Sequence, residues 1–294
     1  MRVGVVGAGL MGTAVTQRLL AAGFEVLAYD TDADKRTAIA AVGAKPQAAA
    51  NVVIAGCEIN VLCVFDTGQV EEVIAGAGGG VDAIEQGGTG ARMFVVTSTC
   101  DPDRLAALAQ RVEPRGARII EYPVSGTSRQ VAQGDGVGLV GGDPAVIERA
   151  APVLDAICGS RHYLGQIGNG SRAKLAVNLI LGLNRAAIAE GLVFAERLGL
   201  DRVAFLEVAR GSAAYSRVMD VKGDAMARRE YQMPQSRVDQ SLKDFRLMLE
   251  QARTTGQDLP FAAVYARMLE DCTAHGEARW DNAAIAEAIA RLRI

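Results

Sequence analysis

Residues 1–12 read M-R-V-G-V-V-G-A-G-L-M-G, and this stretch decides the fold. Residues 1–6 are an apolar run that predicts a short strand, and a helical pattern continues from the glycines through Ala22. G-x-G-x-x-G directly after a strand and opening a helix is the setting in which this motif binds a dinucleotide. Its first glycine permits a tight turn, its second lets the backbone approach a pyrophosphate, and its third allows close packing of helix on strand. The phosphates would lie at the helix N-terminus.

The second predicted strand, 25–29, ends at Asp30. In folds of this type an acidic residue at this position hydrogen-bonds the adenosine ribose, and its charge repels a 2′-phosphate. Asp30 therefore predicts a preference for NAD over NADP. Lys35 and Arg36 lie in the helix expected next and act in the opposite direction, so NADP is the alternative cofactor.

Short apolar runs alternate with helical stretches through the rest of the N-terminal half. We expect further strands at 59–65, 93–97, 117–122, 137–140 and 162–164, helices at 32–42, 68–75, 101–112 and 144–157, and a glycine-rich loop at 76–90. This alternation predicts a parallel or mixed sheet with helices on both faces. Ligands of such sheets bind at the carboxyl ends of the strands, where 65–68, 97–99 and 123–127 supply polar or small groups. Asp101, followed by Pro102, is expected as a helix N-cap rather than a catalytic acid.

Past Gly168 the apolar residues recur at helical spacing, and we expect helices at 169–198, 201–210, 235–255, 260–274 and 282–292. The predicted fold is an α/β Rossmann-type dinucleotide-binding domain at 1–164 followed by an all-α substrate and oligomerisation domain at 165–294, joined by the long helix. Charged residues along that helix favour a buried helix over a membrane span. Because such an apolar helix commonly packs against a second subunit, we expect a homodimer or homotetramer.

The composition excludes several classes of function. The 294 residues carry a net charge of −3, which does not indicate the excess of positive charge that binds nucleic acid or an anionic membrane. Five scattered cysteines without a C-x-x-C pair indicate reduced thiols, and no signal peptide precedes the first strand, so we expect a cytoplasmic protein. With only two histidines there is little material for a Ser-His-Asp site or a metal centre, and no metal is expected.

Residues 165–178 read G-Q-I-G-N-G-S-R-A-K-L-A-V-N and open the long helix. Lys174 and Asn178 are four residues apart, so they point from one face of that helix. A lysine that faces inward on an apolar helix is costly, because desolvation favours its neutral form. Proton transfer by the amine is one explanation. A lysine that extends from the helix start into solvent is the other.

Four motifs in order resemble those of the β-hydroxyacid dehydrogenase family, which includes 3-hydroxyisobutyrate dehydrogenase and tartronate semialdehyde reductase. They are G-A-G-L-M-G at 7–12, P-V-S-G at 123–126, the glycine-rich lysine motif at 165–178 and K-D-F at 243–245. The resemblance covers essentially the whole chain. It implies hydride transfer between a nicotinamide cofactor and a small β-hydroxyacid or its semialdehyde or keto form.

The resemblance also assigns roles to individual residues. Lys174 would be the catalytic general acid–base. Substrate binding would fall to Ser125, Gly126, Thr127 and Asn178. The cofactor would contact Gly7, Ala8, Gly9, Leu10, Met11, Gly12, Asp30, Val64, Phe65, Thr99 and Lys243.

The chain departs from the family pattern near the substrate motif, where Glu121-Tyr122 replaces the usual Asp-Ala and Thr127 replaces a glycine. Together with Arg129, these changes predict a substrate pocket that is not the standard one. Two alternatives stay open. An imine or other carbonyl reductase on the same scaffold typically lacks the lysine found here, and a non-catalytic dinucleotide-binding protein predicts a degraded catalytic motif. The chain also lacks the longer helical part of members that act on a sugar phosphate, so a short-chain carboxylate is expected.

Overall fold

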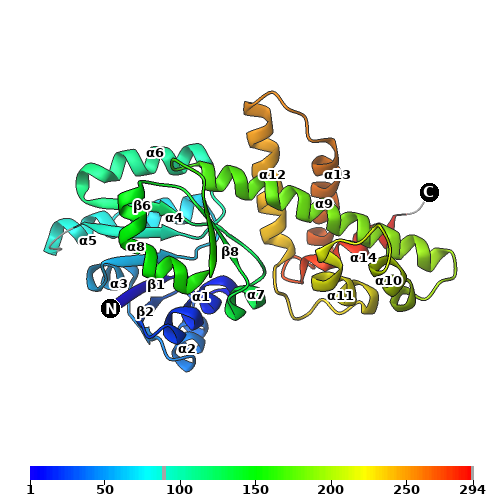
Figure 1. Cartoon of the computed structure of the whole chain (residues 1–294), viewed down its shortest axis with the longest axis horizontal. Coiled ribbons are helices and arrows are strands. Elements are labelled where there is room, and N and C mark those ends of the chain that lie inside the picture. Colours follow the sequence, from blue (N-terminus) through cyan, green and yellow to red (C-terminus); the bar gives the residue numbers. More distant parts are fainter. Residues whose placement is uncertain (88–90, 293–294) are drawn as a thin grey trace. The chain divides into compact units, whose positions relative to one another are not determined.

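The computed structural model describes residues 1–87 and 91–292, and the chain divides into two units, Met1–Lys174 and Leu175–Ile294 (Figure 1). The first unit is built on strands and helices, and the second is helical. Each unit has its own apolar core.

Six parallel strands form the main sheet of the first unit, in the order β3-β2-β1-β4-β5-β6. They are β1 (Arg2–Val6), β2 (Glu25–Tyr29), β3 (Lys45–Pro46), β4 (Ile59–Leu62), β5 (Arg92–Val96) and β6 (Ala117–Glu121). The strand order runs outward in both directions from the β1–β4 pair. Ligands of open parallel sheets bind at such a switch point, beyond the carboxyl ends of the strands. The expected Rossmann-type architecture is confirmed.

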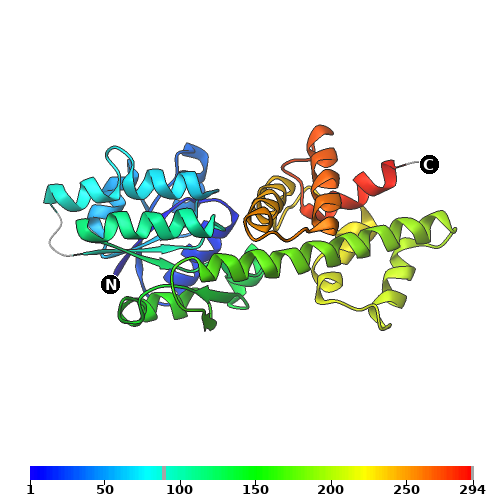
Figure 2. The same ribbon diagram turned by 90° about the horizontal axis from the view of Figure 1, so that it is seen from above.

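Helices cover both faces of this sheet (Figure 2). They are α1 (Leu10–Ala21), α2 (Ala33–Ala41), α3 (Ala50–Gly56), α4 (Thr67–Ala75), α5 (Gly80–Gly87), α6 (Pro102–Val112), which continues into the 3₁₀ turn η1 (Glu113–Arg115), and α8 (Pro144–Ile157). Successive strand residues enter opposite cores, as Val5 and Val6 do, because side chains alternate across a strand.

A second, three-stranded sheet lies in the same unit. Its strands are β7 (Val124–Ser125), β8 (Val137–Val140) and β9 (Ser160–Tyr163), with β7 antiparallel and β9 parallel to β8. Helix α7 (Ser128–Gln133) connects β7 to β8. An isolated bridge between Glu121 and Gly141 joins the end of β6 to this sheet. The P-V-S-G motif therefore begins where the main sheet ends.

The expectation of a loop over 76–90 is wrong for its central part, which forms α5; residues 88–90 lie outside the described residues. Val81 is buried in the core and Ile84 packs against it, so the segment has an inward face at helical spacing. The surrounding glycines hide this short pattern. The short elements α3, α7, β3 and β7 were not predicted either.

The second unit is all-α, as expected. Its elements are most of α9 (Asn169–Arg197), α10 (Arg202–Arg210), the π-helical turn η2 (Met219–Gly223), α11 (Asp224–Arg228), α12 (Val238–Thr254), α13 (Pro260–Ala274), η3 (Asn282–Ala284) and α14 (Ile285–Arg291). The 219–228 segment was not predicted, and the expected helix at 282–292 divides into η3 and α14. Phe245 and Tyr265 join α12 to α13 in the core, with ring centroids 4.5 Å apart.

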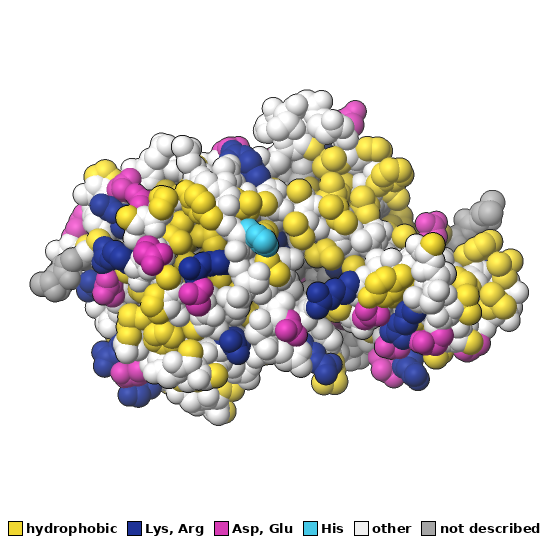
Figure 3. All heavy atoms as spheres, viewed as in Figure 1, with side chains coloured by type: hydrophobic (Ala, Val, Ile, Leu, Met, Phe, Trp, Pro, Cys, Tyr) yellow, Lys and Arg dark blue, Asp and Glu magenta, His cyan; other side chains and the backbone are white. Residues whose placement is uncertain are grey.

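Helix α9 is less buried than expected. Among the described residues it is the one helix long and apolar enough to cross a membrane by length and composition, and 28% of its apolar window is buried. Ala189 and Leu192 enter the core, whereas Ile180 and Phe194 are 61% and 63% exposed. The expectation of a buried helix is wrong for the single chain, because the helical core covers only one side of it. Figure 3 shows apolar areas on the surface of this unit.

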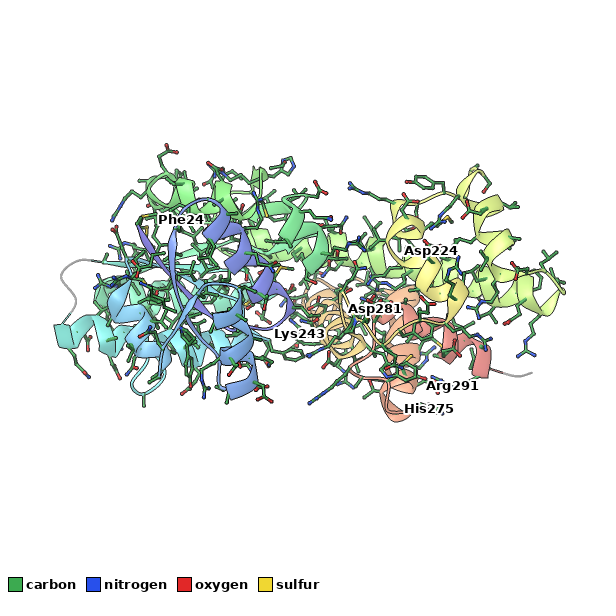
Figure 4. All side chains as sticks on the ribbon, turned by 90° about the horizontal axis from the view of Figure 1, so that it is seen from below. Phe24, Asp224, Lys243, His275, Asp281 and Arg291 are labelled. Atoms are coloured by element: carbon green, nitrogen blue, oxygen red, sulfur yellow. The ribbon has the colours of Figure 1, made fainter. Side chains whose placement is uncertain are left out.

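A buried ion pair links η2 to the segment before η3. The Lys222 Nζ lies 2.8 and 2.6 Å from the two carboxylate oxygens of Asp281. Figure 4 labels Asp281 within the helical unit. Both side chains are almost fully buried. The Asp281 carboxylate also accepts the backbone N–H groups of Gln235 (2.8 Å) and Ala283 (3.0 Å). One carboxylate therefore satisfies three donors from three segments.

Replacing Asp281 by alanine should destabilise the helical unit by about 3–5 kcal/mol, because it leaves the Lys222 ammonium buried without a counter-charge. Trp280 is the chain's single tryptophan and stacks on Tyr231 in this unit, so its fluorescence reports unfolding there. Urea titration followed by that fluorescence measures the change.

Glu270→Ala is the matched control, since Glu270 pairs with Arg246 on the surface of the same unit. Its loss should cost less than about 1 kcal/mol, because exposed pairs are screened by water. Equal losses for the two variants would contradict the importance of the buried pair.

Candidate active site

The three glycines of the cofactor motif are required for three different reasons. Gly7 has φ +96°, and a Cβ there would lie 2.5 Å from the Cys63 carbonyl oxygen. A Cβ at Gly12 would lie 1.8 Å from the Gly7 carbonyl oxygen, so helix α1 packs directly on the turn. A Cβ at Gly9 would meet nothing within 4 Å. Protein packing explains Gly7 and Gly12, and the space at Gly9 fits the approach of a ligand.

This open turn leads into the first turn of α1. Gly9 is the N-cap and offers no side-chain hydrogen bond to the first-turn N–H groups, which in any helix lack intrahelical partners. Leu10 and Met11 lie in that turn and expose part of their surface. N–H groups at a helix N-terminus are a site for a phosphate. The residues present therefore fit a dinucleotide pyrophosphate.

Asp30 holds the glycine turn against the end of β2. Its carboxylate accepts the Ala8 N–H at 2.8 Å and the Asp32 N–H at 2.9 Å. Each carboxylate oxygen has a second acceptor position, so Asp30 can also accept a ribose hydroxyl. Lys35 Nζ lies 3.8 Å from the same carboxylate, and Arg36 donates to the Asp30 carbonyl at 2.7 Å. The Lys35 ammonium and the Arg36 guanidinium are thus both held by Asp30.

The segments that follow β4 and β5 are fastened to each other. The Ser98 hydroxyl donates to the Val64 carbonyl at 2.7 Å, which places Thr99 in the segment beside Val64 and Phe65. The Phe65 N–H donates to the Gln69 side chain at 2.8 Å. The expected cofactor contacts Val64, Phe65 and Thr99 thus lie at the carboxyl edge of the sheet.

Lys174 lies against the substrate motif. The residue is 8% exposed, and its Nζ donates to the Val124 carbonyl at 2.7 Å. Val124 precedes Ser125 in β7, so the fold brings the lysine and the P-V-S-G motif together across 50 residues of sequence. The amine is buried rather than extended into solvent. Desolvation makes a buried ammonium costly, which is consistent with a functional group.

Two of the residues expected to shape the substrate pocket have structural roles in the fold. Tyr122 is fully buried, and its hydroxyl donates to the Leu154 carbonyl at 2.9 Å, so it belongs to the core. Thr127 caps helix α7: its hydroxyl accepts the Gln130 N–H, and its own N–H donates to the Gln130 side chain at 2.9 Å. That N–H is therefore engaged in this structure. Arg129 is exposed on α7.

Within the helical unit, Asn178 and Lys243 meet at one carboxylate. Asn178 Nδ2 donates to Asp244 at 2.9 Å, and Lys243 Nζ lies 2.9 Å from the other Asp244 oxygen. Figure 4 labels Lys243 on α12. Sequence reasoning named Asn178 and Lys243 but missed Asp244 as the residue that joins them. Its place inside the K-D-F motif was the available signal.

The sequence pointed to Glu121 only as a departure from the family pattern, and its role at the start of α9 was missed. Its side chain is completely buried, and its carboxylate accepts the N–H groups of Gly168, Gly170 and Ser171 at 2.8–2.9 Å. Burial raises the pKa of the Glu121 carboxyl, although these three N–H groups oppose the shift. Its position at the end of β6 gave only a weak signal.

Asp101 is an N-cap, as predicted: its carboxylate accepts the N–H groups of Asp103 and Arg104, and Pro102 begins helix α6. Within residues 1–87 and 91–292 no group of three or more His, Cys, Asp or Glu side chains is placed to hold a metal ion.

Two family models match the chain. The model for the NAD binding domain of 6-phosphogluconate dehydrogenase covers residues 2–165, and the model for the NAD-binding region of NADP-dependent 3-hydroxyisobutyrate dehydrogenase covers residues 168–289. The chain belongs to the β-hydroxyacid dehydrogenase family. The expected function, hydride transfer between a nicotinamide cofactor and a small hydroxyacid, is confirmed at the level of this family.

Members of this family from distant organisms align over nearly the whole chain. A 2-hydroxy-3-oxopropionate reductase of Escherichia coli (strain K12) is 31% identical over 98% of this chain and 97% of its own length. The chloroplastic glyoxylate/succinic semialdehyde reductase 2 of Arabidopsis thaliana is 30% identical over 98% of this chain and 79% of its own length. A crystal structure of 3-hydroxyisobutyrate dehydrogenase from Salmonella typhimurium superposes with a TM-score of 0.88 and 25% identity, covering 98% and 99% of the two chains.

Gly9→Ala should weaken NADH binding tenfold or more while leaving thermal stability unchanged. The φ of Gly9 is −73°, which alanine adopts readily, and the new methyl group meets no protein atom. It would occupy the space through which the pyrophosphate approaches the backbone. Fluorescence titration with NADH and thermal unfolding by circular dichroism measure the two effects.

Gly12→Ala is the contrasting variant. Its methyl group would overlap the Gly7 carbonyl, so it should lower the free energy of unfolding by about 1–3 kcal/mol. Unchanged NADH affinity in Gly9→Ala would show that the cofactor does not bind at this turn.

Proposed function

We propose that this protein is an NAD-preferring dehydrogenase of a short-chain β-hydroxyacid, or a reductase of its semialdehyde or keto form, with Lys174 as the general acid–base. The observation that carries the proposal is the buried Lys174 amine, 2.7 Å from the carbonyl oxygen that precedes Ser125. The buried lysine also argues against an imine reductase, and the intact motif argues against a non-catalytic dinucleotide-binding protein.

In the proposed mechanism Lys174 takes the proton of the substrate hydroxyl during oxidation and returns it to the carbonyl oxygen during reduction. The bound nicotinamide supplies or accepts the hydride. The Ser125 hydroxyl and the Gly126 N–H bind the substrate carboxylate. Thr127 contributes by fixing the start of α7, since its N–H is engaged in the cap. Asn178 orients the substrate or the lysine, and Asp244 holds the Asn178 amide.

A screen of short hydroxyacids with NAD⁺, and of semialdehydes and keto acids with NADH, followed by NADH absorbance, tests the substrate class. Turnover of at least one short-chain carboxylate is expected. Faster turnover of 6-phosphogluconate than of every short acid would contradict the proposal.

Lys174→Met should slow the chemical step by roughly 10²–10⁴-fold, because the proton loses its acceptor and donor. Methionine matches the length of lysine and suits buried surroundings, so the fold and NADH affinity should change little. Single-turnover hydride transfer measures the step, and the pH–rate profile should lose the limb that belongs to the lysine.

Lys243→Met is the matched control for this variant. As a proposed cofactor contact, Lys243 should affect NAD binding more than the chemical step. Full turnover in both variants would show that Lys174 is not the acid–base.

Asp30→Ser should narrow the preference for NAD over NADP by an order of magnitude or more, because it removes the charge that opposes a 2′-phosphate. Asp30 also anchors the Ala8 N–H, so Asp30→Asn, which keeps an acceptor there, is the control for loss of the anchor. The ratio of kcat/KM for the two cofactors is the measurement. Equal or higher kcat/KM with NADP in the unmodified protein would contradict the assignment.

We also propose a role for each part of the chain, an oligomeric state and a cellular compartment. Residues 1–164 bind the dinucleotide, and residues 165–294 supply substrate contacts and the interface of a homodimer or homotetramer. The exposed apolar side chains of α9, Ile180 and Phe194 among them, support the interface. All five cysteines are free, which supports a reducing compartment such as the cytoplasm. Sedimentation velocity tests the oligomer, and fractionation with an antibody tests the compartment.

A further inference from the structure

The carboxylate of Glu121 caps the helix that carries Lys174. Its Oε2 accepts the N–H groups of Gly168 and Gly170, both at 2.9 Å, and its Oε1 accepts the Ser171 N–H at 2.8 Å. These donors are N–H groups at the start of α9, where the helix dipole is positive. Hydrogen bonds to a charged acceptor are stronger than neutral ones. The start of the helix is thus bound to the end of strand β6.

Two glycines make room for this carboxylate. A Cβ at Gly170 would lie 2.9 Å from the Glu121 Oε2, and a Cβ at Gly141 would lie 2.6 Å from the same atom. The Glu121 main chain is fixed as well, since it exchanges two hydrogen bonds with Gly141. The last glycine before the lysine is therefore explained by close packing against Glu121 and against the Leu139 carbonyl oxygen, 2.8 Å from such a Cβ. Flexibility of the turn is not needed to explain it.

Glu121 binds the start of α9, and Val124 binds the Lys174 amine one turn further along that helix. Gly170 lies one helical turn before Lys174, and the Lys174 amine donates to the carbonyl of Val124, three residues after Glu121. A single segment, 121–124, therefore holds the start of the helix through a side chain and receives the lysine amine through its main chain. Any shift of the helix start moves the amine relative to Ser125.

We propose that Glu121 is a positioning residue, whose carboxylate fixes the start of α9 so that the Lys174 amine is held beside Ser125. The inference rests on the proposed role of Lys174 as general acid–base. Glutamine keeps the shape of the side chain but brings an NH₂ group against an N–H donor. The amide therefore cannot satisfy all three N–H groups as the carboxylate does.

The test is a double-mutant cycle of Glu121→Gln with Lys174→Met, measured by single-turnover hydride transfer. In the presence of Lys174, Glu121→Gln should slow the step about 10- to 100-fold, since a small misplacement of a catalytic group has effects of this size. In the Lys174→Met background the same change should alter the rate less than twofold, because Glu121 acts through the lysine. NADH affinity should be unchanged in both.

Two further variants complete the experiment. Glu121→Asp keeps the charge and should recover most of the rate. Asp143→Asn changes another N-cap carboxylate of the same unit, at helix α8, and should have no effect. If Glu121→Gln fails to bind NADH, Gly141→Ala is measured in the two lysine backgrounds in its place, because its methyl group would lie 2.6 Å from the Glu121 Oε2 and displace the carboxylate, with the same slowing expected.

An equal slowing in both backgrounds, or no slowing with Lys174 present, would overturn the inference. A Lys174→Met variant with full activity would instead overturn the proposed function, so the two failures are distinguishable.

Discussion

The hydrogen bond from the Lys174 amine to the Val124 carbonyl is the contact around which the candidate site is arranged. It requires that the start of α9, the end of β6 and strand β7 occupy fixed positions in one unit. The Glu121 carboxylate supplies the first constraint, and pairing of β7 with β8 supplies the second. The Val124 carbonyl is a backbone acceptor that offsets part of the cost of burying the amine.

The cofactor turn is fixed in a similar way, by a carboxylate, at the carboxyl ends of β1 and β2 on the same edge of the sheet. Asp30 accepts the Ala8 N–H and thereby fixes the turn that precedes α1. Its charge therefore fixes the shape of the turn, and in the proposed function it also opposes a 2′-phosphate on the ribose. Gly12 closes the turn from the other side, because only a glycine allows the helix to approach the Gly7 carbonyl. If Asp30 selects the cofactor as proposed, the selectivity and the geometry of the loop depend on the same side chain.

Elements with a strong apolar period were predicted with accurate bounds, as β2, β8, α8 and α13 show. The two-residue strands and the short helices α3, α5 and α7 were missed, since so few residues carry no clear period. The site motifs were visible because their residues are close in sequence. The capping role of Glu121 was not, because its partners lie 47–50 residues away. The hydrogen bond that engages Thr127 is local, but a capping box and a ligand-binding turn look alike in sequence.

The replacement of the family's Asp-Ala by Glu121-Tyr122 changes the support of the site more than its lining. The Tyr122 ring is buried against Gly138, where an added Cβ would lie 2.4 Å from the ring, so a large side chain directly after β6 is matched by the absence of one on β8. Glu121 extends from the same place to the start of α9. Both residues lie where the main sheet meets the small sheet, directly before the P-V-S-G motif in the sequence. The difference from the family pattern therefore bears first on how Lys174 is held, and in the proposed mechanism the choice of substrate falls to the groups around Ser125.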